Sequence, residues 1–349
     1  GCASALRSAT DRSCMLAADP RALVGSTALT DLRVDSLVRV DGTLATYVAT
    51  STPDGQECTL RVAMAVPLPH ERDAAVSSEL RRLARHAVGV RGLCAPRSAG
   101  AVVIGSERLL AVAHLGTARE SAEDRIASGP PVPFDEVLLR LQPVAAALSA
   151  LHDQGLVHGA LHAGAVRLGA LGPILSGFGL SQLALLLGGP TAARDVVPPR
   201  GRVPEQVGIV AASPTPESDT YAFAMVACEL LAGRPLTSET EPSAIARAID
   251  DPMVRPTPAS LGVTLPAHVE EAFRSALAAQ PRERAVTPTA LLAAWSASPP
   301  KPDSSHDEPS AVQEPEPQPR SRRVRSALER VNAERTPLAP SPPAPAPRV

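Results

Sequence analysis

The sequence predicts an α+β fold in which a small lobe of short antiparallel strands precedes a larger helical lobe. Between residues 33 and 115 the apolar runs are short and are separated by turn signals such as Asp41-Gly42, a pattern typical of strands joined by hairpins. After Pro133 the apolar residues recur roughly every three to four positions, which is the period of a helix. The 349 residues are 44% hydrophobic, which is enough to build two such lobes.

The expected elements follow one another along this part of the chain. Short runs rich in β-branched and apolar residues predict strands at 37–40, 46–49, 58–64, 102–104 and 109–112. Helical spacing predicts helices at 78–86, 134–151, 219–231, 242–249, 268–278 and 289–295. Pro143 should bend the second of these helices, because proline removes a backbone donor.

The composition changes at both ends of this region. Residues 1–32 mix small and polar residues without periodicity, so we predict a flexible flank before a folded domain at 33–297. Within that domain we expect the sheet lobe at 33–115 and the helical lobe at 130–297. Residues 298–349 are rich in Pro, Ser, Glu and Ala, which predicts a disordered tail because too little apolar surface is buried to offset ordering entropy.

One segment of the tail has helical spacing. Val324, Leu328 and Val331 would share one face of a short helix within 321–335. An isolated helix of this length is marginal in water, so two interpretations remain open. The segment is either a solvated linker or a helix that folds on a partner.

The charge and the cysteines limit the classes of function. A net charge of −2 gives no reason to expect a nucleic-acid partner. The five cysteines are scattered and form no Cys-x-x-Cys pair, which argues against a disulfide framework or a zinc site and for a reducing compartment, the cytoplasm. No apolar run reaches the length of a membrane span. The only lysine, Lys301, lies in the tail, so the folded domain has no lysine for binding phosphate.

Two segments in the second half carry a family resemblance. Residues 158–165 read His-Gly-Ala-Leu-His-Ala-Gly-Ala, and 176–179 read Ser-Gly-Phe-Gly. They resemble the catalytic loop (His-Arg-Asp-Leu-Lys-Pro-Glu-Asn) and the Asp-Phe-Gly loop of bacterial serine/threonine protein kinases. Further segments support the resemblance by their order and spacing: Leu37–Val62, Val203–Glu205, Ser218–Tyr221, Glu229–Pro235 and Pro281–Arg284. The resemblance implies a protein kinase-like two-lobed fold.

The chemical residues of that family are replaced here. The resemblance places Ala160 at the catalytic Asp, Ala165 at the metal-binding Asn and Gly177 at the metal-binding Asp. An alanine accepts no proton and a glycine side chain offers no oxygen to a metal. We therefore expect no catalytic residue and no metal site in this domain.

The nucleotide-binding positions are altered as well. Arg39, Asp41 and Leu44 stand where the family has the three glycines of its phosphate loop, and Arg61 stands where it has the ATP-binding lysine. Side chains in this loop obstruct the close approach of backbone N–H groups to phosphates, and arginine does not substitute for lysine as a compact point charge. We expect no nucleotide or other cofactor.

The resemblance implies structural roles for a second set of residues. His158 and Phe178, with Leu83, fall at positions that stack into a spine joining the lobes, and Asp219 falls where the family's helix hydrogen-bonds the catalytic-loop backbone. Glu205 and Arg284 fall where the family has a buried ion pair, which is costly to break.

Two points about this set remain open. Glu79 either pairs with Arg61 as an inter-lobe ion pair or lies solvated on its helix. His158 and His162 have the i, i+4 spacing of metal ligands, but without a third ligand nearby we interpret them as a packed and a loop histidine.

The hypothesis that follows is a pseudokinase, a catalytically impaired regulatory or scaffolding module that binds protein partners. The alternative is an atypical but active serine/threonine kinase that binds ATP and Mg²⁺ with substituted residues, such as Arg61 for phosphate and Glu79 or Asp195 for metal. A third possibility is a degenerate gene product without a retained role. The joint loss of lysine, both aspartates and the asparagine favours the first.

Overall fold

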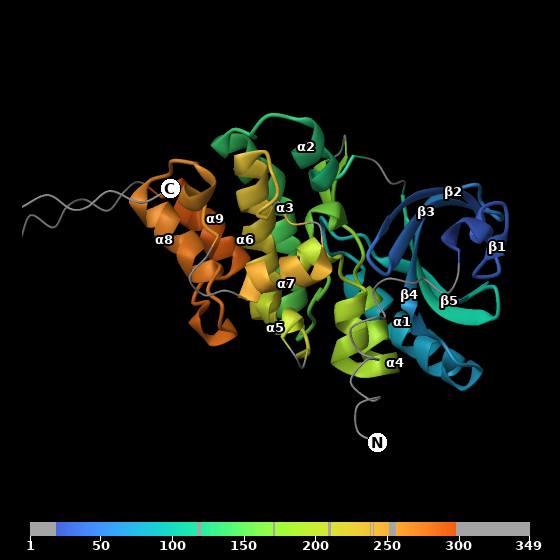
Figure 1. Ribbon diagram of the computed structural model, residues 1–349. Coiled ribbons are helices and arrows are strands. Elements are labelled where there is room, and N and C mark those ends of the chain that lie inside the picture. The colour runs from blue at the N-terminus through green and yellow to red at the C-terminus, as the bar shows by residue number, and fades with distance from the viewer. Residues whose placement is uncertain are drawn as a thin grey trace, which may run out of the picture. The chain divides into compact units, whose positions relative to one another are not determined.

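The computed structural model describes residues 19–116, 120–169, 172–208, 211–237, 239, 241–250 and 256–297 (Figure 1). These residues all belong to one compact unit. The expected tail helix at 321–335 and most of the expected flank lie outside the described residues.

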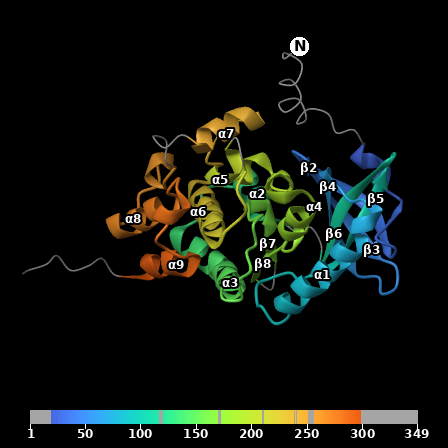
Figure 2. The ribbon, with the colours of Figure 1, turned by 90° about the horizontal axis from the view of Figure 1, so that it is seen from below.

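The first lobe is built on a six-stranded antiparallel sheet with the strand order β1-β2-β3-β4-β6-β5. Its strands are β1 (Thr27–Ala28), β2 (Leu32–Asp41), β3 (Leu44–Ser51), β4 (Glu57–Pro67), β5 (Pro96–Ile104) and β6 (Glu107–Leu115). Each of the five expected strands lies within one of β2 to β6, so these predictions are confirmed. Figure 2 shows the strands gathered on one side of the molecule and α3, α6, α8 and α9 on the other.

The hairpin between β2 and β3 has a tight turn, as does the hairpin between β5 and β6. Asp41 pairs with Leu44, which leaves a two-residue turn of Gly42 and Thr43. Gly42 has φ +60°, a left-handed conformation that glycine adopts without the cost paid by other residues. The turn carries the hairpin over the cleft between the lobes, as described below.

The predicted flexible flank is wrong from residue 20 to residue 32. Pro20–Leu23 form a single 3-10 turn and β1 pairs with β2. The Tyr47 hydroxyl donates a hydrogen bond of 2.7 Å to the Pro20 carbonyl, and Leu23 is buried in the core of the sheet lobe. The apolar residues of this segment follow no clear period, and its order comes from these long-range contacts.

The second lobe is helical, as predicted. It also contains a short hairpin of β7 (Val166–Gly169) and β8 (Gly172–Leu175). One helix, α1 (Asp73–Ala87), belongs to the first lobe and packs beside its sheet. The remaining described helices are α2 (Ala122–Ser128), α3 (Phe134–His152), α4 (Leu180–Asp195), α5 (Pro204–Val207), α6 (Pro216–Ala232), α7 (Pro242–Asp250), α8 (Ala267–Ala276) and α9 (Pro288–Ser296). The helix α3 continues through Pro143.

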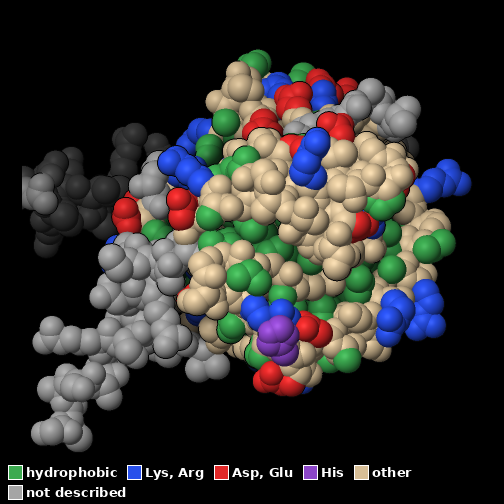
Figure 3. Space-filling view, turned by 90° about the vertical axis from the view of Figure 1, so that its right-hand side faces the viewer, with side chains coloured by type: hydrophobic (Ala, Val, Ile, Leu, Met, Phe, Trp, Pro, Cys, Tyr) green, Lys and Arg blue, Asp and Glu red, His purple; other side chains and the backbone are tan. Residues whose placement is uncertain are grey.

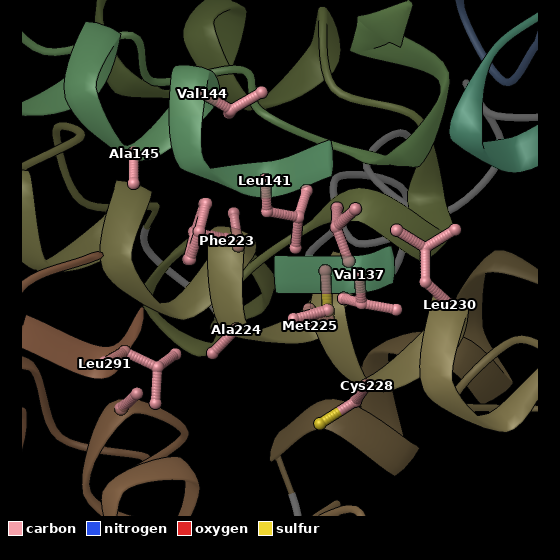
Figure 4. Packing of buried hydrophobic residues seen from close by; sticks show 14 of the residues in the cluster. Val137, Leu141, Val144, Ala145, Phe223, Ala224, Met225, Cys228, Leu230 and Leu291 are labelled. Atoms are coloured by element: carbon pink, nitrogen blue, oxygen red, sulfur yellow. The ribbon is translucent and has the colours of Figure 1, made fainter. Parts of the chain in front are cut away.

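The core of the helical lobe lies around α6. Thr215 caps the helix start with its hydroxyl, Pro216 occupies the first turn, and Gly233 ends the helix at φ +61°. Residues 218–231 are all buried, which is typical of a helix packed on every side. Figure 4 shows Phe223 and Met225 of α6 against Leu141 of α3. This rigid centre supports the loops of the cleft.

Helix α4 was not predicted. The sequence offered only a short apolar run there, and the structure forms a helix that is broken at Gly188 and Gly189. Its Leu180 and Leu183 belong to one buried cluster with Leu83 of α1. The helix therefore lies against α1 and β4, directly after the Gly-Phe-Gly segment (Figure 1).

The outward face of the sheet lobe carries a groove of about 640 Å³ between residues 26–30, α1 and β5. Figure 3 shows hydrophobic side chains gathered across the middle of this face and charged groups near its margins. Arg108 at one margin is bound to Asp73, with both carboxylate oxygens at 2.8 Å. This groove lies on the outer face, away from the cleft residues described next.

Candidate functional site

The three positions expected to have lost their chemistry lie together under the cleft. Ala160 and Ala165 are buried and present only methyl groups. Gly177 has φ +92°, and a Cβ built on it would lie 3.8 Å from the Arg61 Cζ atom. Among the described residues, no three His, Cys, Asp or Glu side chains come together in a way that would hold a metal ion.

Arg61 lies in this space with neutral partners. It is 4% exposed, and its Nη2 donates a hydrogen bond of 2.8 Å to Ser176 Oγ, while Nη1 lies 3.5 Å from His114 Nδ1. No carboxylate pairs with it among the described residues. Burial, with a further contribution from the nearby positive charge of Arg167, lowers the pKa of Arg61 to about 10. A cation is thus held in the interior by uncharged groups.

Ser176 connects Arg61 to the loop at 158–165. Its Oγ donates to the Ala165 carbonyl at 2.9 Å, and its own carbonyl accepts from His158 Nε2 at 3.2 Å. From the sequence, no role was expected for this hydroxyl. In the structure it is a link between β4 and the loop at 158–165.

His114 completes the network and was missed by sequence reasoning. Its Nε2 donates to the Phe178 carbonyl at 2.9 Å, which leaves Nδ1 to accept from Arg61. Burial and the charge of Arg61 lower the pKa of His114 to about 3, so the ring is neutral. No motif marks this residue, and only its pairing in β6 brings it beside Arg61.

Arg39 crosses from the sheet lobe to the helical lobe. Its Nε lies 2.7 Å from Asp41 Oδ2 on its own strand, and its Nη1 lies 2.6 Å from Glu123 Oε2 of α2. A Cβ placed on Gly164 would collide with Arg39 Nη2, so the guanidinium covers this part of the loop. Burial raises the pKa of Asp41, and Arg39 opposes this rise.

The hairpin tip adds two contacts. Thr43 Oγ1 donates a hydrogen bond to the Asp195 carbonyl at the end of α4. A Cβ on Gly42 would lie 2.9 Å from Pro199 Cδ, so this position requires glycine for space as well as for its backbone conformation. Leu44 is buried in the same cluster as Phe178 and points into the core.

Arg167 on β7 is a further guanidinium that the sequence did not single out. Its Nη1 donates to the Gly164 carbonyl at 3.4 Å, and its Nη2 is buried without a hydrogen-bond partner among the described residues. Burial and the positive charge of Arg39 lower its pKa. Arg39, Arg61 and Arg167 therefore form a cationic cluster around the loop at 158–165.

Glu79 does not pair with Arg61, so the inter-lobe ion pair considered for it is not formed. Both of its carboxylate oxygens accept hydrogen bonds from Arg82 on the next turn of α1, at 2.8 and 2.6 Å. These hydrogen bonds lower its pKa against the effect of partial burial. The half-buried side chain is not freely solvated either.

The Asp219 carboxylate lies under the loop that begins at His158. Its oxygens accept from the backbone N–H groups of His158 at 2.7 Å and Gly159 at 2.8 Å, and from His152 Nε2 at 3.0 Å. The charge-assisted hydrogen bonds hold the loop onto α6. Asp219 therefore makes the hydrogen bonds to the backbone of this loop that the resemblance implied.

Phe178 and His158 lie in contact at the base of the cleft. Their ring centroids are 6.4 Å apart, and Phe178 shares its buried cluster with Leu83 of α1. Burial lowers the pKa of His158, which uses Nδ1 as an acceptor for the Ala160 N–H. His162 likewise accepts from the Gly164 N–H, and burial lowers its pKa.

Glu205 and Arg284 form a bidentate ion pair deep in the helical lobe. The two N···O distances are 2.8 and 2.7 Å, and Arg284 also donates to the carbonyls of Ala278, Ala279 and Glu217. Burial raises the pKa of Glu205, but the hydrogen bonds and charge of Arg284 outweigh this and hold the pKa below its ordinary value. Both carboxylate oxygens of Glu205 and all three guanidinium nitrogens of Arg284 are hydrogen-bonded.

The sheet lobe and the helical lobe together have the two-lobed fold of a protein kinase domain. By sequence, the chain matches no protein-family model and no curated protein. By structure, it is similar to the Mycobacterium tuberculosis PknI kinase domain, with a TM-score of 0.56 at 20% identity over 78% of this chain and 98% of that one. The C20A_R136A double mutant of the same domain gives a TM-score of 0.57 at 20% identity over the same shares. At such identity the likeness concerns the fold.

Proposed function

We propose that this chain is a pseudokinase, a kinase-like domain that binds protein partners and does not transfer phosphate. The observation that carries the proposal is the state of the cleft. Arg61 is bound to Ser176 and His114, beside Ala160, Ala165 and Gly177, where phosphoryl transfer would need a base and metal ligands.

Phosphoryl transfer depends on positioned charge more than on covalent chemistry. A base contributes about 10²–10⁴-fold, and metal ions neutralise the charge that develops on the phosphate. The two carboxylates that the alternative hypothesis uses as metal ligands, Glu79 and Asp195, are paired with arginines. Glu79 is bound to Arg82, and the Asp195 carboxylate lies 3.0 Å from Arg194 Nε. These contacts weigh against an atypical active enzyme.

The position at which the kinase family binds nucleotide phosphates is also unfavourable for binding them here. Arg39 covers Gly164, and the hairpin tip meets Pro199, so the backbone of this turn is in contact with protein where a phosphate loop would need to meet phosphates. We propose that neither ATP nor Mg²⁺ is a cofactor. No described helix is long and apolar enough to span a membrane. We propose a cytoplasmic location because of the scattered cysteines.

A thermal-shift titration of the full chain with ATP, with and without Mg²⁺ or Mn²⁺, tests the proposal. A ligand at about 100 times its Kd stabilises the folded state by about 2.7 kcal/mol, so binding would raise the Tm by several degrees. We expect no shift and no incorporation of phosphate from labelled Mg·ATP. A metal-dependent shift together with incorporation that Arg61→Ala abolishes would overturn the proposal and favour the atypical enzyme.

A further inference from the structure

The β2–β3 hairpin makes the polar contacts that close the cleft at its mouth. We propose that this hairpin is a latch between the lobes and that Arg39 is the residue that fastens it. Arg39 reaches Glu123 of α2 at 2.6 Å while it also holds Asp41 at 2.7 Å. The same guanidinium covers Gly164. One side chain thus joins the strand, the helix and the loop.

The tip of the hairpin contributes the other half of the latch. Thr43 is hydrogen-bonded to the carbonyl of Asp195, and Gly42 lies against Pro199. These contacts are with the last residue of α4 and with Pro199 after it, whereas Arg39 contacts α2. The hairpin therefore meets the helical lobe at two separate places, and the two sets of contacts release together when the hairpin lifts.

The free energy of closure is a balance of opposed charges. Arg39, Arg61 and Arg167 lie near one another, and repulsion among these cations favours an open cleft. The carboxylates of Asp41 and Glu123 oppose this repulsion through Arg39. The side chains of Arg39 and Glu123 are 22% and 42% exposed, although the Glu123 oxygen that faces Arg39 is itself buried. Breaking this pair therefore costs more than breaking a fully exposed pair and less than disrupting a packed core.

Opening would change what the cleft presents. Lifting the hairpin removes the cover from Gly164 and brings Arg61 and Arg167 toward solvent. The latch therefore controls whether the cationic lining of the cleft is available. The inference does not depend on the proposed absence of catalysis, because it rests on the hairpin contacts of the unliganded protein and makes no use of the residues at the catalytic positions.

Amide hydrogen exchange of the full chain tests the latch, with Arg39→Ala compared against Arg33→Ala. The control is matched, because Arg33 lies on the same strand and pairs with Asp35 two residues on, as Arg39 pairs with Asp41, but Arg33 has no described partner in the other lobe. We expect Arg39→Ala to speed exchange about three- to tenfold at 40–46 and at 195–203, as loss of a partly exposed pair implies. Equal exchange in both variants would overturn the latch.

A charge reversal gives a second, independent measurement. Glu123→Gln should speed exchange at the same residues, and Arg39→Glu combined with Glu123→Arg should slow it again relative to Arg39→Glu alone. This comparison holds even if Arg39→Ala folds poorly, because Glu123→Gln keeps the side-chain volume. If Glu123→Gln leaves 40–46 unchanged, or the reversed pair shows no recovery, Arg39 does not fasten the hairpin through Glu123.

Discussion

Two buried polar regions of this domain each contain an arginine, and the two arginines differ in the charge of their partners. Arg284 in the helical lobe has a bidentate carboxylate, three carbonyl acceptors and the ring of Tyr221 at 4.8 Å. Arg61 in the cleft has a serine hydroxyl and a neutral histidine. Both side chains are nearly inaccessible to water.

The difference separates groups that hold the fold from groups that fill a site. A buried charge with a complete set of partners is costly to disturb, because removing one partner leaves the other uncompensated. For a buried cation with neutral partners, the hydrogen bonds offset only part of the free-energy cost of desolvation. Arg61 therefore contributes by occupying the cleft and linking its walls, whereas Arg284 fixes the segment around Glu205 to the end of the lobe.

The largest expected effect is on the Glu205–Arg284 pair. Glu205→Ala or Arg284→Ala should lower the free energy of unfolding by about 3–5 kcal/mol, because each leaves a buried charge without its partner. The double variant should cost less than the sum of the two, since the second change removes the orphaned group. Chemical denaturation of each variant measures these values.

Arg282→Ala is the matched control, since Arg282 is exposed two positions before Arg284. It should change stability by less than about 0.5 kcal/mol. If the single variants of the pair unfold like the wild type, the ion pair does not hold the two segments together and the comparison with Arg61 fails.

The next effect concerns the neutral histidine beside Arg61. The pKa of His114 is about 3 in the folded state and about 6.5 when unfolded, so below pH 6.5 only the unfolded chain gains the proton. Stability should therefore fall as the pH falls from 6.5 toward 3, by about 1.4 kcal/mol per pH unit for this residue.

His114→Gln keeps one donor and one acceptor but does not titrate. Between pH 7.5 and 5.5 the wild type should lose about 1.4 kcal/mol more stability than this variant. Urea denaturation at the two pH values gives the difference. Parallel losses would show that His114 titrates alike in the folded and unfolded states, and that it is not held neutral beside Arg61.

A smaller effect is expected for the cleft arginine itself. Arg61→Met removes a desolvated cation, and Ser176 keeps its hydrogen bond to Ala165. The change in stability should lie within about 1 kcal/mol, because replacing a poorly compensated buried charge with an apolar side chain is often neutral. Arg284→Met provides the contrast and should cost more than about 3 kcal/mol. Equal losses in the two variants would remove the distinction drawn between the regions.

The sequence predicted the region around Glu205 and Arg284 better than it predicted the cleft around Arg61. Glu205, Asp219 and Arg284 lie in segments with recognisable neighbours, such as Pro204 and the helix start after Thr215, so their partners followed from the resemblance. The strands and most helices followed from periodicity. Their contacts depend on rigid elements whose order along the chain is enough to place them.

The cleft could not be predicted to the same degree. Arg61 and Ser176 are 115 positions apart, and His114 and Phe178 are 64 positions apart, with no motif that joins them. From the sequence we expected Arg39 to obstruct the approach to phosphates, but no pattern indicated its contact with Glu123. Helix α4, which lies against α1, was also missed because its apolar run was short. Such contacts arise from packing between lobes.

The smallest effect should come from Glu79, whose role the sequence left between two alternatives. Its contact with Arg82 is an i, i+3 pair with side chains 23% and 41% exposed. Pairs of this kind stabilise a helix by about 0.2–0.5 kcal/mol, so Glu79→Gln should lower the free energy of unfolding by no more than that. Arg82→Gln should give a similar value, and the two losses should not add. High salt should reduce both, because it screens a partly exposed pair. A loss of several kcal/mol in Glu79→Gln that Arg82→Gln does not share would mean that Glu79 meets Arg61 in solution. In that case the cleft arginine would have its carboxylate after all, and the two regions would differ less than their contacts indicate.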